Sequence, residues 1–260
     1  MYAKKSLGQN FLKSKSALLS IIKAGEVTSD DTVLEIGPGR GALTEEILKA
    51  GAKLIAIEKD RELIPFLEVK FSKEIKAKQL ILIESDILEL DMATIIKSSG
   101  LQISTYKLIA NIPYYITGEI IRKFFEEKLS PTLMVLLVQK EVAERIVAKD
   151  NKESILSIAC KAYATPKIVT KVSRGAFDPA PNVDSAVISF TNISKKLFPT
   201  NESESNFFEI MKAGFAHKRK KLGGNLKGFE SKLNQDFLNE IKDRRAEELS
   251  VDDWIRLSSK

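Results

Sequence analysis

Cysteine and histidine are almost absent from this sequence of 260 residues, which contains only Cys160 and His217. A single cysteine cannot form an internal disulfide, and two such residues are too few for a typical zinc site. We therefore expect no bound metal ion and no histidine acting as an acid–base catalyst. Cys160 lies in an apolar helical pattern, which favours a small buried side chain.

Long hydrophobic runs are also missing. The longest uninterrupted apolar stretch, Leu133–Val138, has six residues and is far too short to cross a bilayer. No signal-peptide pattern opens the sequence, and a Gly-Gln-Asn-Phe motif at residues 8–11 leaves no room for a transit peptide before it. We expect a cytoplasmic protein.

The positive charges are unevenly distributed, although the net charge of +6 is modest. Three stretches contain lysine or arginine and no acidic residue: residues 1–25, 154–177 and 210–229. Together they favour a polyanionic partner, whereas each stretch alone fits a solvated surface equally well. The hydrophobic share of 43% is typical of a globular chain.

Apolar, strand-like runs alternate with helical patterns through the first two-thirds of the sequence. The expected strands cover residues 32–36, 53–58, 80–84, 106–110 and 133–138. This alternation predicts parallel pairing with right-handed crossovers. Two further expected strands, 168–173 and 183–191, have no long helix between them and suggest an antiparallel hairpin at the sheet edge.

Helical periodicity without strand patterns is found from residue 206 to the end of the sequence. We therefore predict an α/β fold with a mostly parallel, Rossmann-like sheet, an antiparallel edge hairpin and a small C-terminal helical domain. The expected domains are residues 1–192 and 193–260.

A glycine-rich turn, VLEIGPGRG at residues 33–41, ends the first expected strand. Glycines here let the backbone approach a ligand closely. Glu58 ends the next strand, where a carboxylate can accept both ribose hydroxyls of an adenosine ligand. The Gly-x-Gly-x-Gly spacing that includes Gly37 and Gly39 differs from that of NAD-binding turns, which disfavours an oxidoreductase. It favours an adenosine ligand that has a methionine tail in place of a pyrophosphate. The alternative is a tight turn without a ligand.

Asp86 follows the third expected strand, at the edge of the sheet where ligands of such folds bind. Its carboxylate is placed to accept a hydrogen bond from an adenine amine. An isolated Asp after a strand is more often a turn residue or a helix cap. The position of Asp86 in the series of strand ends favours the binding role.

The tetrapeptide Asn111-Ile112-Pro113-Tyr114 directly follows the fourth expected strand. The N6 amine of adenine is a poor nucleophile because its lone pair is delocalised into the ring. The Asn111 side-chain carbonyl and the Ile112 backbone carbonyl can accept its two hydrogens, so that the nitrogen pyramidalises. Pro113 fixes the backbone, and Tyr114 offers a ring for stacking. An ordinary turn is the alternative.

A proline-containing loop surrounds Phe177 and Ala180, before the last expected strand. Phe177 is a candidate for stacking on the other face of a flipped base. Packing of the loop against the core is an equally good interpretation of the local sequence.

Taken together, these residues resemble the ribosomal RNA adenine N6,N6-dimethyltransferase family over nearly the whole chain. The resemblance begins at Gly8–Leu12 and includes Gln139–Val142, Val183–Val187 and a basic helix at residues 215–225. It implies a class I methyltransferase sheet and catalysis at residues 111–114. The implied ligand is S-adenosylmethionine, bound by Asn10, Leu12, Gly37, Gly39, Glu58, Asp86 and Asn111.

Within this family the chain is most similar to the bacterial small-subunit branch. The resemblance implies dimethylation of two adjacent adenosines in a hairpin loop near the 3′ end of 16S ribosomal RNA, during ribosome biogenesis. It also implies a precursor of the small ribosomal subunit as partner, and we expect a monomer. The sequence departs from the family pattern at Glu153, Ala180 and Gly223, which lie on expected RNA-facing surfaces.

Two other functions remain open at this point. One is the related dimethylation of large-subunit ribosomal RNA, which the N-terminal segment and the C-terminal half of the sequence disfavour. The other is an assembly factor that binds RNA without turnover, which the intact residues 111–114 disfavour.

The basic cluster Lys218, Arg219, Lys220 and Lys221 is expected to contact RNA phosphates. Replacing all four with Gln should weaken RNA binding and lower the slope of log K against log salt by up to about 0.7–0.9 for each phosphate that is no longer neutralised. Binding measured at several salt concentrations checks this. An unchanged slope would show that the cluster only faces solvent.

Overall fold

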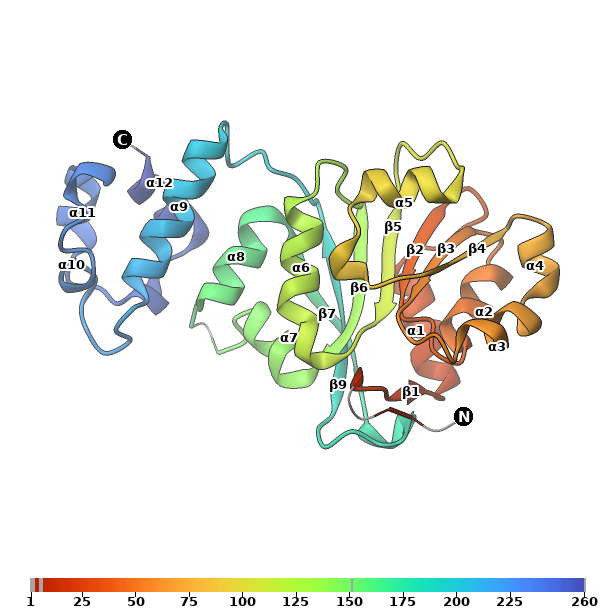
Figure 1. Cartoon of the computed structure of the whole chain (residues 1–260). Coiled ribbons are helices and arrows are strands. Elements are labelled where there is room, and N and C mark those ends of the chain that lie inside the picture. Colours follow the sequence, from red (N-terminus) through yellow and green to blue (C-terminus); the bar gives the residue numbers. More distant parts are fainter. Residues whose placement is uncertain (1–2, 5–6, 151, 260) are drawn as a thin grey trace. The chain divides into compact units, whose positions relative to one another are not determined.

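The structure, a computed structural model that describes residues 3–4, 7–150 and 152–259, contains a seven-stranded sheet (Figure 1). Its strands, in spatial order, are β4 (Leu80–Glu84), β3 (Lys53–Glu58), β2 (Thr32–Ile36), β5 (Lys107–Asn111), β6 (Leu133–Gln139), β9 (Ser185–Thr191) and β7 (Thr165–Val172). From β4 to β6 all pairs are parallel, and β9 runs antiparallel to β6. The predicted parallel sheet with an antiparallel edge is confirmed.

Helices in the connections bury both faces of this sheet, which explains the continuous apolar runs of its strands. These helices are α1 (Lys15–Ala24), α2 (Ala42–Lys49), α3 (Ile64–Lys70), α4 (Ser72–Lys76), α5 (Met92–Ser99) and α6 (Thr117–Glu126). A further helix, α7 (Lys140–Ile146), directly follows β6. Leu133, Val135 and Leu137 of β6 share one hydrophobic cluster with α1 and α2. On α6, Phe125 makes an edge-on contact with Phe190 of β9, with ring centroids 5.7 Å apart.

The described chain divides into two compact units. The first comprises Met1–Ala143 and Lys167–Ile193, and the second comprises Glu144–Pro166 and Ser194–Lys260. The division at residues 192 and 193 that we expected from the sequence stays a prediction. In the part of the chain that the structure describes, no helix is both long and apolar enough to span a membrane.

The second unit is a group of short helices around an aromatic core. It contains α8 (Ile155–Tyr163), α9 (Asn201–Gly214), α10 (Leu222–Asn225), α11 (Gln235–Ile241) and α12 (Val251–Ser258). Thr200 and Ser203 form a capping box that starts α9. Phe207 of α9 and Trp254 of α12 are fully buried, so this unit has a core of its own.

The predicted basic helix at residues 215–225 is wrong. Helix α9 ends at Gly214, and α10 begins only at Leu222. Residues 216–221 are exposed and form a turn in which the Lys220 amide donates to the His217 carbonyl at 3.0 Å. The Leu222 and Gly223 amides donate to the Arg244 and Lys242 carbonyls instead of to residues four positions earlier, and glycine has low helix propensity.

Gly214 is packed so closely that it has no room for a side chain. A Cβ atom at this position would lie 2.3 Å from Cη2 of Trp254, a fully buried ring that cannot move aside. We expect Gly214→Ala to lower the free energy of unfolding by about 1–3 kcal/mol through overpacking.

Gly224→Ala is the matched control, because a Cβ at Gly224 would meet nothing within 4 Å. Its effect should stay within about 0.5 kcal/mol. Trp254 is the only tryptophan of the chain, so urea unfolding followed by its fluorescence measures both variants. Equal stability of the two variants would contradict the close packing of Trp254 against Gly214.

Candidate functional site

A pocket of about 400 Å³ opens at the carboxyl end of the central strands in the first unit. It lies where β2 and β5 are neighbours, the position at which ligands bind in open α/β sheets. Its lining residues are Phe11, Leu12, Lys13, Glu35, Gly37, Pro38, Gly39, Arg40, Ala42, Leu43, Asn111 and Asp178. Of the predicted cofactor-binding residues, Leu12, Gly37, Gly39 and Asn111 line this pocket.

The glycine turn presents bare backbone to the pocket. Gly37 and Gly39 have φ of +65° and +59°, a region that side chains rarely adopt. A Cβ at Gly37 would meet nothing within 4 Å, so this position faces open space. At Gly39 a Cβ would lie 3.0 Å from the Phe11 ring. Gly37 therefore leaves room for a ligand, and Gly39 leaves room for Phe11.

Glu58 lies at the end of β3 and supports the turn. Its carboxylate accepts hydrogen bonds from the Gly39 amide at 3.1 Å and from the Asp60 amide at 2.8 Å. Burial raises the pKa of Glu58, and these two amides oppose the shift. Glu58 is 5% exposed and does not line the pocket, so its predicted contact with ribose hydroxyls stays a prediction.

Asp86 does not line the pocket. Its side chain caps the short 3₁₀ helix Ile87–Glu89 by accepting from the Leu88 amide at 3.0 Å. It also pairs with the Lys59 ammonium at 2.5 Å. Burial opposes ionisation, but Lys59 and the Leu88 amide hold the pKa of Asp86 below its usual value. The capping role is thus observed, and the adenine contact stays a prediction.

The N-terminal segment covers the pocket through a short sheet. Strand β1 (Phe11–Leu12) pairs antiparallel with β8 (Phe177–Asp178). Next to this sheet, the Arg40 guanidinium contacts Asp178 at 3.0 Å and lies 4.3 Å from the centroid of the Phe11 ring. Arg40 therefore connects the glycine turn to both strands of this short sheet, β1 and β8, which we call the cover.

The Phe177 ring is 2% exposed and belongs to the same hydrophobic cluster as Leu12. Of the two interpretations that the sequence left open, the structure shows packing against the core. The proposed stacking of Phe177 on a flipped base would need the ring to leave this cluster, because a buried ring offers no free face.

Asn111 ends β5 with its amide in a defined orientation. The Nδ2 atom donates to the Asn10 carbonyl at 3.2 Å, and since a carbonyl can only accept, Oδ1 lies on the opposite side. Nearby, the Tyr114 hydroxyl and Ser185 Oγ are 2.7 Å apart. Burial raises the pKa of Tyr114 despite this contact, so its hydroxyl stays neutral. Ile112 is buried beside Asn111.

Glu35 is a pocket residue that the sequence reasoning missed. It is the fourth of the five residues of β2, is 1% exposed, and accepts a hydrogen bond from Thr44 Oγ1 at 2.7 Å. Burial raises its pKa to about 8. An acid inside an otherwise apolar strand was the available signal. Phe11 and Arg40 were also missed, because their contacts join distant parts of the chain.

The predicted RNA-binding residues belong to the second unit, whereas the residues that line the pocket belong to the first. Lys218, Arg219, Lys220 and Lys221 are all exposed. Lys221 pairs with Asp243 at 2.8 Å, an exposed contact of little energetic weight. Among the described residues there is no group of three or more His, Cys, Asp or Glu side chains that could hold a metal ion.

The residues of the pocket fit S-adenosylmethionine. Its volume is within the range of about 300–1,000 Å³ found for small-molecule sites, and Gly37 faces open space. Leu12 and Leu43 give it apolar walls, and Asn111 and Glu35 give it acceptors. No pyrophosphate-binding spacing of glycines is present. This fold with this pocket defines the class of S-adenosylmethionine-dependent methyltransferases.

Comparison with known proteins narrows the class. The ribosomal RNA adenine dimethylase family matches residues 1–260. The ribosomal RNA small subunit methyltransferase A of Dehalococcoides mccartyi strain CBDB1 is 41% identical over 98% of this chain and 87% of its own length. The protein of the same name from Fusobacterium nucleatum is 38% identical over 98% and 96%. The chain belongs to the ribosomal RNA adenine dimethylase family.

Solved structures agree with this assignment. A crystal structure of a dimethyladenosine transferase from Plasmodium falciparum is 26% identical, covers 95% of each chain and gives a TM-score of 0.80. The 23S rRNA methyltransferase ErmE, at 21% identity, gives a TM-score of 0.75 over 95% of this chain and 97% of its own. ErmE therefore shows the shared fold.

Glu35→Gln should change the pH dependence of stability. The folded-state pKa of about 8 lies above the ordinary value of 4.5, so the neutral acid is favoured by folding. Its contribution is complete below the unfolded pKa and is lost as pH rises through about 8. Between these values the wild type should lose up to about 1.4 kcal/mol per pH unit relative to Glu35→Gln.

Melting temperatures of the two proteins from about pH 5 to about pH 9 measure this difference. Glu68→Gln is the control, because Glu68 is exposed on α3. Parallel curves for wild type and Glu35→Gln would show that Glu35 is not held as a buried acid.

Proposed function

We propose that this protein dimethylates the N6 amines of two adjacent adenosines in a hairpin loop near the 3′ end of 16S ribosomal RNA, during assembly of the small ribosomal subunit. The observation that carries the proposal is Asn111, which lines the cofactor pocket with its amide oriented by the Asn10 carbonyl. The similarity to small subunit methyltransferases A supports the choice of RNA.

Asn111 and Ile112 act on the target amine. The Asn111 Oδ1 atom and the Ile112 carbonyl accept the two N6 hydrogens, which removes conjugation with the ring and directs the nitrogen lone pair into the pocket. The cofactor supplies an electrophilic methyl group bound to a sulfonium. The methylated amine is cationic and loses its proton readily, so no strong base is needed.

Tyr114 positions the target base by stacking, a contact worth about 1–3 kcal/mol. Its hydroxyl is engaged by Ser185 at 2.7 Å, which restrains the ring. Bases of a single-stranded loop can be splayed out at low cost, and this makes a hairpin loop a suitable substrate. Phe177 would cover the other face of the base if it leaves its cluster.

The exposed basic turn at residues 216–221 supplies cations for phosphates. We assign cofactor binding and catalysis to residues 1–192 and RNA binding to residues 193–260. The protein acts in the cytoplasm as a monomer, with the small-subunit precursor as its partner.

Methylation of immature small subunits tests the proposal directly. Subunits lacking the modification are incubated with the protein and methyl-labelled S-adenosylmethionine, and the nucleosides are identified by mass. We expect N6,N6-dimethyladenosine from 16S ribosomal RNA. Label only in large-subunit RNA would favour a resistance-type methylase, and subunit binding without label would favour an assembly factor.

Asn111→Ala is the diagnostic variant in the same assay. Loss of the amine acceptor should reduce the rate about 100-fold or more, as for other groups that act on the transition state. Subunit affinity should remain nearly unchanged, since phosphate contacts are intact. Weaker binding with an unchanged maximal rate would contradict the role of Asn111 in activating N6.

A further inference from the structure

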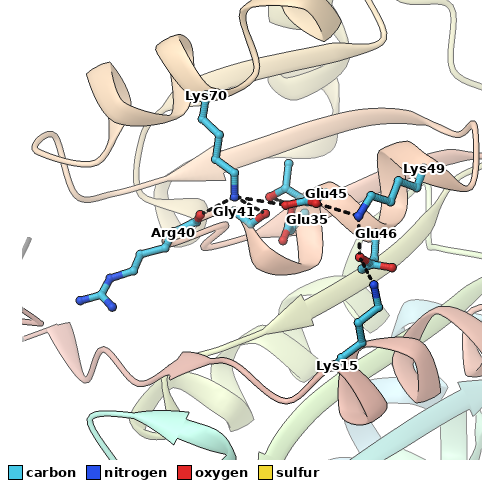
Figure 2. Close-up of polar contacts among 9 residues, drawn as sticks. Lys15, Glu35, Arg40, Gly41, Glu45, Glu46, Lys49 and Lys70 are labelled. Carbon is cyan, nitrogen blue, oxygen red and sulfur yellow. Dashed lines mark hydrogen bonds and ion pairs between the residues drawn. The ribbon is translucent and has the colours of Figure 1, made fainter.

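The segment between the glycine turn and α2 is held from its outer side by one lysine of α3. Lys70 Nζ donates to the Arg40 carbonyl at 3.1 Å and to the Gly41 carbonyl at 3.3 Å. It also lies 3.5 Å from Glu45 Oε2. Figure 2 shows these three acceptors converging on the ammonium group. An ammonium has three donors, so it can face all three acceptors at once.

Lys70 is supported by its neighbour in the sequence. Its Nζ atom is 4.9 Å from the centroid of the Phe71 ring. The same ring packs against the turn, since a Cβ at Gly41 would lie 2.5 Å from Phe71 Cε2. Two neighbouring residues thus hold the segment. Lys70 binds the carbonyls of Arg40 and Gly41, and Phe71 fills the space that Gly41 leaves by having no side chain.

The glycine turn needs such support, because glycines lose the most conformational freedom on folding. Within the turn, the Gly39 amide donates to Glu58 and the Gly41 amide donates to the Pro38 carbonyl at 2.8 Å. Lys70 adds the outer contact. By fixing the peptide between Arg40 and Gly41, it also fixes the Cα atom of Arg40. The Arg40 side chain points away from Lys70 in Figure 2.

We propose that Lys70 is a positioning residue for the cofactor, which keeps the backbone of residues 37–41 in its binding conformation before the cofactor arrives. Preorganisation of this kind raises affinity without a direct contact. The proposal rests on the cofactor of the family and is independent of which RNA is methylated.

The test compares Lys70→Met with Lys49→Met. Met keeps the length of the stem and removes all donors. Lys49 also pairs with Glu45, at 2.7 Å, and with Glu46 at 3.0 Å, but it contacts neither turn carbonyl. Lys49→Met therefore removes an ion pair with the same acid and leaves the turn contacts intact. Lys70→Arg is the rescue variant, because it restores a cation with several donors.

The measurement is calorimetric titration with S-adenosylhomocysteine in the absence of RNA. We expect Lys70→Met to weaken binding about tenfold, Lys70→Arg to recover most of the affinity, and Lys49→Met to match the wild type. With saturating cofactor the methylation rate should return, so KM for the cofactor rises while kcat changes little. Hydrogen exchange at residues 37–44 of the ligand-free protein should be faster in Lys70→Met than in Lys49→Met.

Equal affinities and equal exchange in the two methionine variants would overturn the proposal. So would equal weakening in both, which would assign the effect to the charge of Glu45. If Lys70→Met does not fold, Lys70→Gln carries the same two measurements. Failure of the wild type to bind S-adenosylhomocysteine would overturn the cofactor assignment and this proposal together, whereas failure to methylate 16S ribosomal RNA would leave both standing.

Discussion

The reversal of strand order between β2 and β5 is the constraint on which the site depends. Because β2 lies between β3 and β5, the connections that leave β2 and β5 diverge and leave a crevice at the strand ends. The glycine turn and Asn111 border this crevice. Both strands are buried in the core, so the separation of ligand-binding and reacting groups is set by the backbone pairing of the sheet rather than by flexible loops.

The crevice is completed by contacts between parts of the chain that are distant in sequence. β1 and β8 close it from outside, and Arg40 connects this cover to the glycine turn. Behind the turn, Lys70 of α3 and the adjacent Phe71 occupy the opposite side. The short segment of residues 37–41 thus receives the cofactor on one side, supports the cover through Arg40, and is itself supported by Lys70 and Phe71.

Local patterns in the sequence were sufficient to predict the sheet and some of the residues of the site. Strands β2, β3 and β4 have the predicted bounds, because their apolar runs stop at residues that favour turns. Gly37 and Asn111 could be found because one directly follows a strand and the other ends one, and Gly39 because it belongs to the glycine-rich turn that begins at Gly37. Arg40, Phe11 and Lys70 could not, since their roles depend on partners that only tertiary structure brings near. The helix expected at residues 215–225 does not form, because the Leu222 and Gly223 amides bond to the distant carbonyls of Arg244 and Lys242 and the two glycines have low helix propensity.

The cover formed by β1 and β8 contains only two residue pairs, whereas β2 and β3 share five. Such a short ladder can open locally while the sheet beneath it stays intact. Under the proposed function, two methyl groups on each of two adenosines require four cofactor molecules in succession. A cover that opens independently of the core would then allow spent cofactor to be exchanged between transfers without rebuilding the RNA complex each time.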